Sequence, residues 1–148
     1  ANIALACDIT IASAEASFIQ AFSKIGLIPD SGGTFFLPRI IGSQKAAALM
    51  MLGDKVSSIE AEKMGMIYRV VDADELDSVG LTTAKKLAKM PTYGLALTKQ
   101  ALNISLTNSL EQQLEVEDQL QTKAGNSYDY TEGVNSFLEK RKPTFLGK

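Results

Sequence analysis

The sequence predicts an α/β fold in which short strands and helices come first and helices alone follow. Residues 8–13 (DITIAS) are rich in β-branched residues, which favour a strand, and residues 66–72 (MIYRVVD) are predicted as another. From residue 74 onward, apolar residues instead recur at helical spacing. We therefore expect two parts, an α/β core over residues 1–72 and a helical region over residues 73–148.

The first part is predicted to hold short elements. They are, in order, the end of a buried helix at 3–7, strands at 8–13 and 16–22, helices at 43–53 and 57–65, and a strand at 66–72. Residues 34–42 have near-helical apolar spacing, disturbed by a proline. Ser43 is expected to begin one helix and Gly53 to end it. Ser57 and Glu60 have the spacing of a capping box for the next helix.

The second part is predicted to form four helices. They cover residues 75–90, 92–106, 108–125 and 129–142, and prolines stop the first and the last. Asn108 and Glu111 are expected to cap the third helix. Asp129 and Glu132 are expected to cap the fourth.

The composition is that of a globular protein of one-domain size. The 148 residues are 45% hydrophobic and 22% charged, with a net charge of −2. Acidic residues are spread along the chain, which argues against nucleic-acid binding. No apolar run approaches the ~20 residues that cross a bilayer. The single cysteine, Cys7, excludes an internal disulfide and fits a reducing compartment, so we expect a cytoplasmic protein.

The chain has no histidine, which excludes several kinds of site. Ser-His-Asp and Cys-His catalytic sites need an imidazole, and the usual Cys/His zinc sites need more than one thiolate. Proton transfer must therefore rest on Asp, Glu, Lys or Tyr side chains. We expect neither a metal nor a cofactor.

Asp30 stands in the stretch KIGLIPDSGGTFFLPRIIG, between a proline and a pair of glycines. Either Asp30 or Ser31 could simply cap the helix that follows. A carboxylate beside apolar side chains at a helix entrance could instead move protons. The stretch lacks the lysine and the glycine spacing of phosphate-binding loops, so such a loop is disfavoured. These residues alone leave capping and proton transfer open.

Four stretches, taken in order, resemble the crotonase superfamily of acyl-CoA hydratases and isomerases. They are ALACDITIAS, GLIPDSGGTFFLPRIIG, AAALMMLGDKVSSIEAEKMGMIYRVVD and EGVNSFLEKRKPTF. The resemblance implies the C-terminal part of a crotonase-like (ClpP/crotonase) spiral of ββα units, followed by a helical region for trimerisation. It also implies a thioester enolate stabilised by two backbone N–H groups, with carboxylates that move protons.

The same resemblance places part of the active site outside these residues. The chain begins without a methionine, inside an apolar segment, and the glycine-rich oxyanion turn of the family would lie immediately before Ala1. We therefore expect that residues 1–148 alone do not catalyse the reaction.

Two positions depart from the hydratases of the superfamily. Where those enzymes carry glutamates, this chain has Asn2 and, eight residues before Asp30, Phe22. Without both acids the addition of water lacks its proton carriers, so hydratase activity is disfavoured. Several isomerases of the superfamily have a catalytic aspartate at the position of Asp30. The resemblance therefore makes Asp30 the expected proton shuttle, and one carboxylate suffices because isomerisation adds and removes nothing.

The substrate expected from the resemblance is an aromatic acyl-CoA. The stretch GLIPDSGGT is most similar to isomerases that open the ring epoxide of such a thioester in phenylacetate breakdown. The alternative is a Δ3,Δ2-enoyl-CoA isomerase, or a hydratase-like enzyme, of fatty-acid oxidation. A second alternative, from another class of protein, is a non-catalytic scaffold.

Four further residues near Asp30 or its expected pocket have two interpretations each. Asn2 could contact substrate, or could be a polar residue at a helix start. Phe22, Ile25 and Leu27 could line an acyl or aryl pocket, or pack in the core as large hydrophobic residues usually do.

Near the end of the chain, Phe137 and Lys140 could hold coenzyme A, as the corresponding residues do in the resembling enzymes. They are three residues apart, and so are expected on one helix face. The other interpretation is a solvated basic helix end. The expected ligand is an acyl-CoA thioester, and the expected assembly is a homotrimer or a hexamer made of two trimers. Neither nucleic acid nor a membrane is an expected partner.

Overall fold

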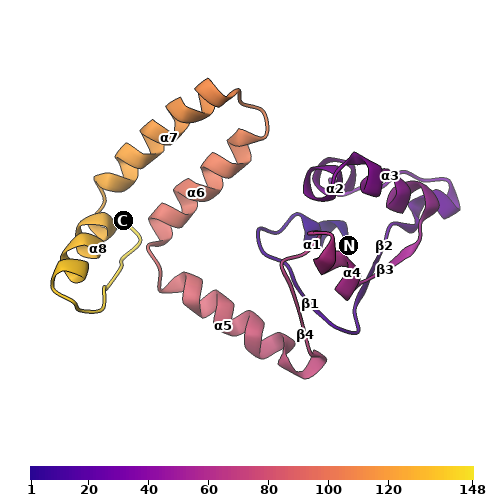
Figure 1. Ribbon diagram of the computed structural model, residues 1–148, viewed down its shortest axis with the longest axis horizontal. Coiled ribbons are helices and arrows are strands. Elements are labelled where there is room, and N and C mark those ends of the chain that lie inside the picture. Colours follow the sequence, from indigo (N-terminus) through magenta and orange to yellow (C-terminus); the bar gives the residue numbers. More distant parts are fainter. The chain divides into compact units, whose positions relative to one another are not determined.

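The computed structural model describes residues 1–148, and its contacts divide the chain into two compact units, Ala1–Leu81 and Thr82–Lys148. The boundary lies within helix α5 (Leu76–Ala88) and not after residue 72. The first unit carries the four strands, and the second is helical (Figure 1). None of the helices combines the length and the apolar character needed to span a membrane.

The first unit is built from short elements, as the sequence predicts. They are α1 (Asn2–Leu5), β1 (Ile11–Ser13), β2 (Ser17–Ile19), the 3-10 helix η1 (Ala21–Ile25), α2 (Gly33–Ile41), α3 (Ser43–Leu52), β3 (Lys55–Ser57), α4 (Ser58–Lys63), β4 (Arg69–Val71) and the 3-10 helix η2 (Ala73–Glu75). Each predicted strand is present but is only three residues long. Strand β3 was not predicted from the sequence. It has three residues and one buried side chain, Val56, which is too short for an alternating hydrophobic pattern to be recognised.

Two pairs of strands connect distant parts of the first unit. β1 lies parallel to β4, with Ile11 opposite Arg69, and β2 lies antiparallel to β3. The side chains between these strands and the helices form one apolar core. Its buried members are Leu5, Ala12, Phe18, Leu37, Ala46, Val56, Ala61, Met66 and Ile67. Because α1 and α2 both contribute to it, this core sets the position of the turn that precedes α2.

The predicted helix ends of the first unit are right in two places and wrong in one. The Ser57 side chain and Glu60 form the predicted capping box of α4. Gly53 ends α3 in a left-handed conformation, with φ of 65°. The N-cap of α3 is Gly42, however, and Ser43 is the first helical residue.

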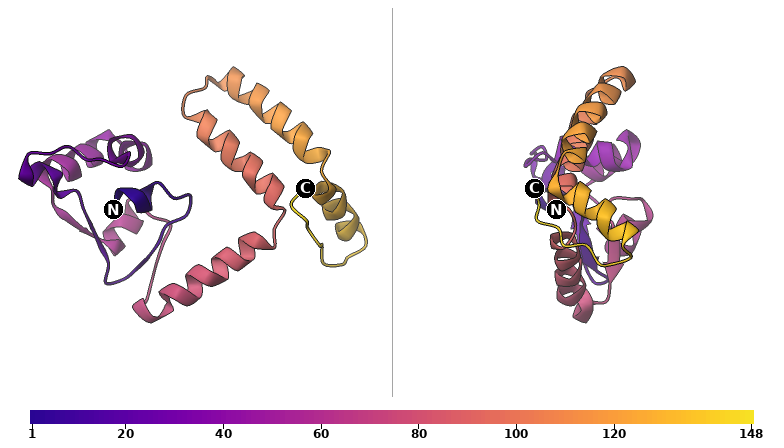
Figure 2. Two further views of the ribbon diagram at one scale, coloured as in Figure 1. Left: turned by 180° about the vertical axis from the view of Figure 1, so that it is seen from behind. Right: turned by 90° about the vertical axis from the view of Figure 1, so that its left-hand side faces the viewer.

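The second unit contains the predicted helices. After α5 come α6 (Thr92–Ser105), α7 (Leu110–Gly125) and α8 (Tyr128–Leu138). α6 and α7 lie side by side as an antiparallel hairpin in both directions of view (Figures 1 and 2). Among the apolar side chains of this unit, Leu97 and Leu120 are the buried ones, so its helices bury little apolar surface against one another.

The caps predicted for the last two helices are wrong by one or two residues. Ser109 caps α7 in a capping box with Gln112. Ser127 caps α8, and Asp129 and Glu132 lie inside that helix. Ser, Asn and Asp are similarly good N-caps, so a sequence with several of them in a row does not reveal which one is used.

Gly33, the first residue of α2, has no room for a side chain. A Cβ atom at this position would lie 2.5–2.7 Å from the amide atoms of the buried Asn2. We expect Gly33→Ala to lower the free energy of unfolding by about 1–3 kcal/mol, because overpacking forces buried groups apart. Chemical denaturation of the full-length protein measures this.

Gly80, inside α5, provides the matched control. A Cβ atom there meets nothing within 4 Å. Gly80→Ala is expected to raise the free energy of unfolding by about 0.5–1 kcal/mol, through the better helix propensity of alanine. A Gly33→Ala protein as stable as the parent would contradict the close approach of Asn2.

Candidate functional site

Asp30 lies in the turn before α2, and its side chain is exposed. The Ser31 hydroxyl donates a hydrogen bond to Asp30 Oδ1, at 3.0 Å. The N-cap of α2 is Gly32, and no side chain bonds to the start of this helix. The capping interpretation of Asp30 and Ser31 is therefore wrong, and the Asp30 carboxylate is open to a ligand.

The backbone of this turn is held in one conformation. Ser31 has a φ of 49° and Gly32 a φ of 78°, two successive left-handed residues of which the first is uncommon for a residue with a side chain. The Asp30 carbonyl oxygen accepts the Gly33 N–H at 2.8 Å and the side-chain amide of Asn2 at 3.0 Å. Two donors on one carbonyl leave the peptide plane after Asp30 a single orientation.

A pair of buried amides supports the turn. Asn2 is 5% exposed and Gln20 is 2% exposed, and Gln20 Nε2 donates to Asn2 Oδ1 at 2.5 Å. The Asp30 carbonyl can only accept, so Asn2 must present its NH₂ group to it and its oxygen to Gln20. Gln20 must in turn present its own NH₂ group. Gln20 Oε1 is then left buried without a hydrogen-bond partner.

Asn2 is the first residue of α1, so its predicted position at a helix start is confirmed. Its side chain forms hydrogen bonds with the Asp30 carbonyl and the Gln20 amide. A contact between Asn2 and substrate stays a prediction.

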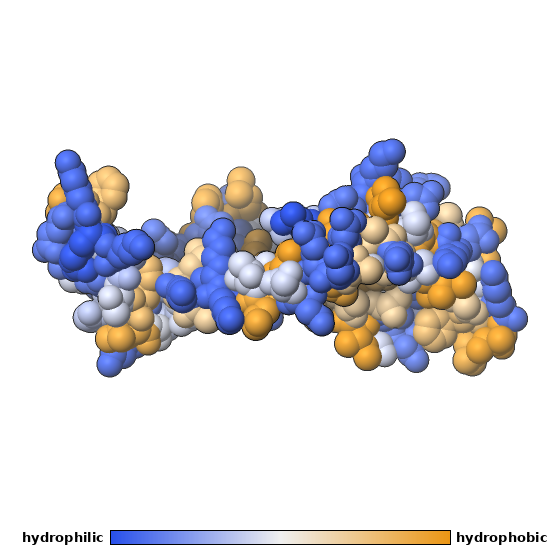
Figure 3. Space-filling view, turned by 90° about the horizontal axis from the view of Figure 1, so that it is seen from below, coloured by the Kyte–Doolittle hydropathy of each residue, from blue (hydrophilic) through white to orange (hydrophobic).

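The predicted pocket residues lie on η1 and on the loop between η1 and Asp30. Ile25 is 73% exposed and Leu27 58% exposed, so the core interpretation is wrong for both. Phe22 is half-buried in η1. Figure 3 shows other places where hydrophobic residues reach the surface among hydrophilic ones. The segment before Asp30 thus carries an exposed apolar surface, and its role as a pocket wall stays a prediction.

Phe137 and Lys140 are both exposed, the first at 83%. Their predicted common helix face is wrong, because α8 ends at Leu138 and Lys140 follows with a left-handed φ of 54°. The chain turns at Lys140 and its side chain leaves the helical pattern. A contact of these two residues with coenzyme A stays a prediction.

Two buried carboxylates on α8 hold the segment that follows the helix. Asp129 accepts the N–H groups of residues 146 and 147, at 2.6 and 2.9 Å. Glu132 accepts two guanidinium N–H groups of Arg141, at 2.6 and 2.7 Å, and the N–H of Thr144 at 2.8 Å. Sequence analysis missed this role, because most of the partners are main-chain groups that leave no mark on the sequence.

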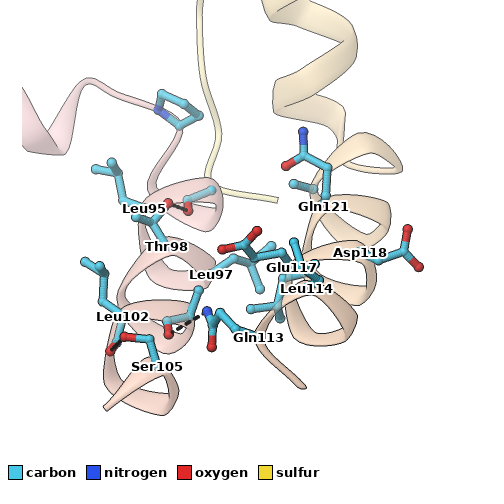
Figure 4. Close-up of a pocket in the computed structure, with 15 residues that line it drawn as sticks. Leu95, Leu97, Thr98, Leu102, Ser105, Gln113, Leu114, Glu117, Asp118 and Gln121 are labelled. Carbon is cyan, nitrogen blue, oxygen red and sulfur yellow. Dashed lines mark hydrogen bonds between the residues drawn. The ribbon is translucent and has the colours of Figure 1, made fainter. Parts of the chain in front are cut away.

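Two hollows lie within the second unit. One, of 880 Å³, follows the α6–α7 hairpin, where Leu97 reaches toward α7 and Gln113 bonds across to α6 (Figure 4). The other, of 550 Å³, is lined by the start of α6, the end of α7 and α8 with Phe137. Both linings are mainly apolar. No group of three or more Cys, Asp and Glu side chains lies where it could hold a metal ion.

The chain is similar to known proteins over its whole length. The family model described as "Enoyl-CoA hydratase/isomerase" matches residues 1–148. The 1,2-epoxyphenylacetyl-CoA isomerase of Escherichia coli K12 is 49% identical over 148 residues, which are 100% of this chain and 56% of that protein. A probable enoyl-CoA hydratase of Rhodobacter capsulatus is 42% identical, over 100% of this chain and 58% of that protein.

The fold is that of solved structures of the same kind. A Mycobacterium abscessus protein described as an enoyl-CoA hydratase/isomerase superposes with a TM-score of 0.96 at 37% identity, covering 99% of this chain and 56% of that one. The chain is therefore crotonase-like, as the sequence predicts. It spans just over half the length of the curated relatives it matches.

Glu132 makes the stability of the second unit depend on pH. The hydrogen bonds from Arg141 and then from the Thr144 N–H lower the pKa of Glu132 from 4.5 to about 2. Because the folded pKa lies below the unfolded one, its contribution is complete above pH 4.5 and is lost as the pH falls toward 2. We expect Glu132→Gln to lower Tm by several degrees at pH 7 and to flatten the Tm profile between these pH values.

The matched control is Glu139→Gln. Glu139 also pairs with Arg141, at 2.5 Å, but its side chain is exposed, and the main-chain N–H of Thr144 bonds to Glu132 and not to Glu139. Solvent-exposed ion pairs contribute little, so its Tm profile should match that of the parent. Equal profiles for all three proteins would show that Glu132 does not hold the segment.

Proposed function

The chain belongs to the enoyl-CoA hydratase/isomerase family, and we propose from this that the whole protein isomerises an acyl-CoA thioester with Asp30 as the group that moves the proton. One observation carries the proposal. Asp30 presents an exposed carboxylate from a turn whose backbone is held by two hydrogen bonds to its carbonyl oxygen. A reacting group in fixed geometry is what proton transfer to and from carbon requires.

The proposed reaction needs only one carboxylate. Asp30 takes a proton from the carbon beside the thioester carbonyl, and the electrons of that C–H bond pass to the carbonyl oxygen to give an enolate. The carboxylic acid then returns the same proton to another carbon as the electrons move back. In an enoyl thioester a double bond shifts. In a ring epoxide the C–C bond between the two epoxide carbons breaks as the ring expands around the oxygen, which keeps both of its C–O bonds, and no atom is added or lost. Backbone N–H groups of the whole protein would stabilise the enolate oxygen.

Hydration fits the chain less well, because it needs two proton carriers. Asn2 is an amide whose polar atoms are bonded to Gln20 and to the Asp30 carbonyl, and Phe22 has no proton to transfer. The relative named 1,2-epoxyphenylacetyl-CoA isomerase supports an aromatic epoxide as the substrate. The exposed Ile25 and Leu27 would pack against its ring, with a Δ3-enoyl-CoA as the alternative substrate.

We propose that Phe137 and Lys140 contact the coenzyme A part of the substrate. A lysine can pair with a phosphate, and an exposed phenylalanine can pack on the adenine or the pantetheine. We also propose a homotrimer, alone or paired as a hexamer. The exposed leucines of the α6–α7 hairpin support it, because a helical unit with two buried apolar side chains gains stability from a partner.

The test is Asp30→Asn in the full-length protein, with 1,2-epoxyphenylacetyl-CoA and a Δ3-enoyl-CoA as substrates. Isomerisation and deuterium exchange at the α-carbon are followed by NMR. We expect kcat to fall by about 10²- to 10⁴-fold, because an amide cannot accept and return the proton. Thioester binding should persist in the variant.

The matched control is Asp72→Asn, which changes an exposed aspartate that makes no side-chain cap bond at the start of η2. It should leave kcat unchanged. Equal exchange rates for Asp30→Asn and the parent would overturn the proposal. Turnover of the enoyl thioester but not of the epoxide would keep the mechanism and change the substrate.

A further inference from the structure

We propose that Asn2 and Gln20 are positioning residues, which set the Asp30 carboxylate for proton transfer through the backbone of its turn. We call the two side chains the amide pair. The inference rests on the proposed function, since it presumes that Asp30 moves the proton. Neither amide can titrate, so neither can transfer the proton itself.

The amide pair orients the Asn2 side chain, and it does so at a cost to the stability of the fold. A buried polar group without a partner costs free energy, and Gln20 Oε1 is such a group in the middle of the pair. An apolar side chain at position 20 would avoid this cost. The amide at Gln20 gives Asn2 the one orientation in which its NH₂ group faces the Asp30 carbonyl.

A second observation comes from the opposite side of Asn2. The absence of a side chain at Gly33 makes room for the Asn2 amide, which would otherwise overlap with a Cβ atom. The N–H of the same Gly33 is the other donor to the Asp30 carbonyl. Helix α2 and the amide pair therefore both bond to the peptide group between Asp30 and Ser31. Because the Asp30 side chain is attached next to this peptide group, fixing the peptide also limits where the carboxylate can lie.

The side chain of Asp30 also accepts a hydrogen bond from within the turn. The left-handed φ of Ser31 brings its hydroxyl back to Asp30 Oδ1. If the peptide rotates, the Ser31 hydroxyl and the carboxylate move together. Loss of the amide pair should thus displace the carboxylate. The apolar surface formed by Ile25 and Leu27, which we propose packs against the substrate, should stay unchanged.

The second unit offers a matched control. There Asn108 donates to Gln113 at 3.1 Å, and Gln113 donates to the carbonyl of Ala101 at 3.2 Å. This is the same amide–amide–carbonyl arrangement, joining α6 and α7 far along the chain from Asp30. Asn108→Ala should lower Tm without an effect on turnover.

The experiment compares Asn2→Ala, Gln20→Met, Asn108→Ala and Asp30→Asn in the full-length protein. For Asn2→Ala we expect kcat to fall by about 10- to 100-fold, as for a misplaced catalytic group, with KM changed less than about threefold. Hydrogen exchange of the Gly33 amide should accelerate by about tenfold, because its acceptor is no longer fixed. Gln20→Met should show the same two effects more weakly.

The outcomes separate the two proposals. Asp30→Asn with full activity overturns both. A low kcat for Asp30→Asn, with an unchanged kcat for Asn2→Ala and Gln20→Met, overturns the amide pair alone. A fall in kcat for Asn108→Ala equal to that for Asn2→Ala also overturns it, because the effect would then be general destabilisation. If Asn2→Ala does not fold, Gln20→Met decides, since methionine keeps the length of the side chain and removes its unpaired oxygen.

Discussion

The hydrogen bond from the Asn2 side chain to the Asp30 carbonyl joins two parts of the first unit that are far apart in the sequence. It fixes where α1 begins relative to the turn before α2. This hydrogen bond restricts the residues around the Asn2 amide. The NH₂ group of Asn2 needs an acceptor, its oxygen needs a donor, which is Gln20, and the amide leaves no room for a side chain at Gly33. The apolar core under α1 and α2 gives the bond its low-dielectric surroundings, where an amide has few alternatives.

The two units differ in what keeps them folded. The first unit buries a contiguous apolar cluster between strands and helices. The second buries two leucines and relies in addition on carboxylates, which tie the segment after α8 to the helix itself. Charged and main-chain hydrogen bonds are directional, so this segment has a defined path although little apolar surface lies beneath it. Lys140 lies at the start of that path, where its left-handed φ turns the chain away from the helix.

Much of the secondary structure could be predicted, because hydrophobic spacing and glycine or proline stops act locally. The box of Ser57 and Glu60 is an example. The caps at 108–112 and 127–132 could not, since neighbouring polar residues compete for one position. The stretch around Asp30 could be recognised as a candidate site. Nothing local showed that Gln20 is connected to it, because its partner Asn2 lies 18 residues away. The exposure of Ile25 and Leu27 likewise depends on packing and not on pattern.

The parallel pairing of β1 with β4 has a consequence for how the chain is made. Ile11 pairs with Arg69, so this pairing cannot form until about 60 residues after β1 have been synthesised, which takes roughly 3 to 12 s at ordinary rates of synthesis. Non-local parallel pairing also forms slowly once both strands exist. During this interval the edge of β1 that later pairs with β4 is unpaired. Unpaired strand edges associate with other chains, so we expect the nascent chain to need chaperone protection until β4 has emerged.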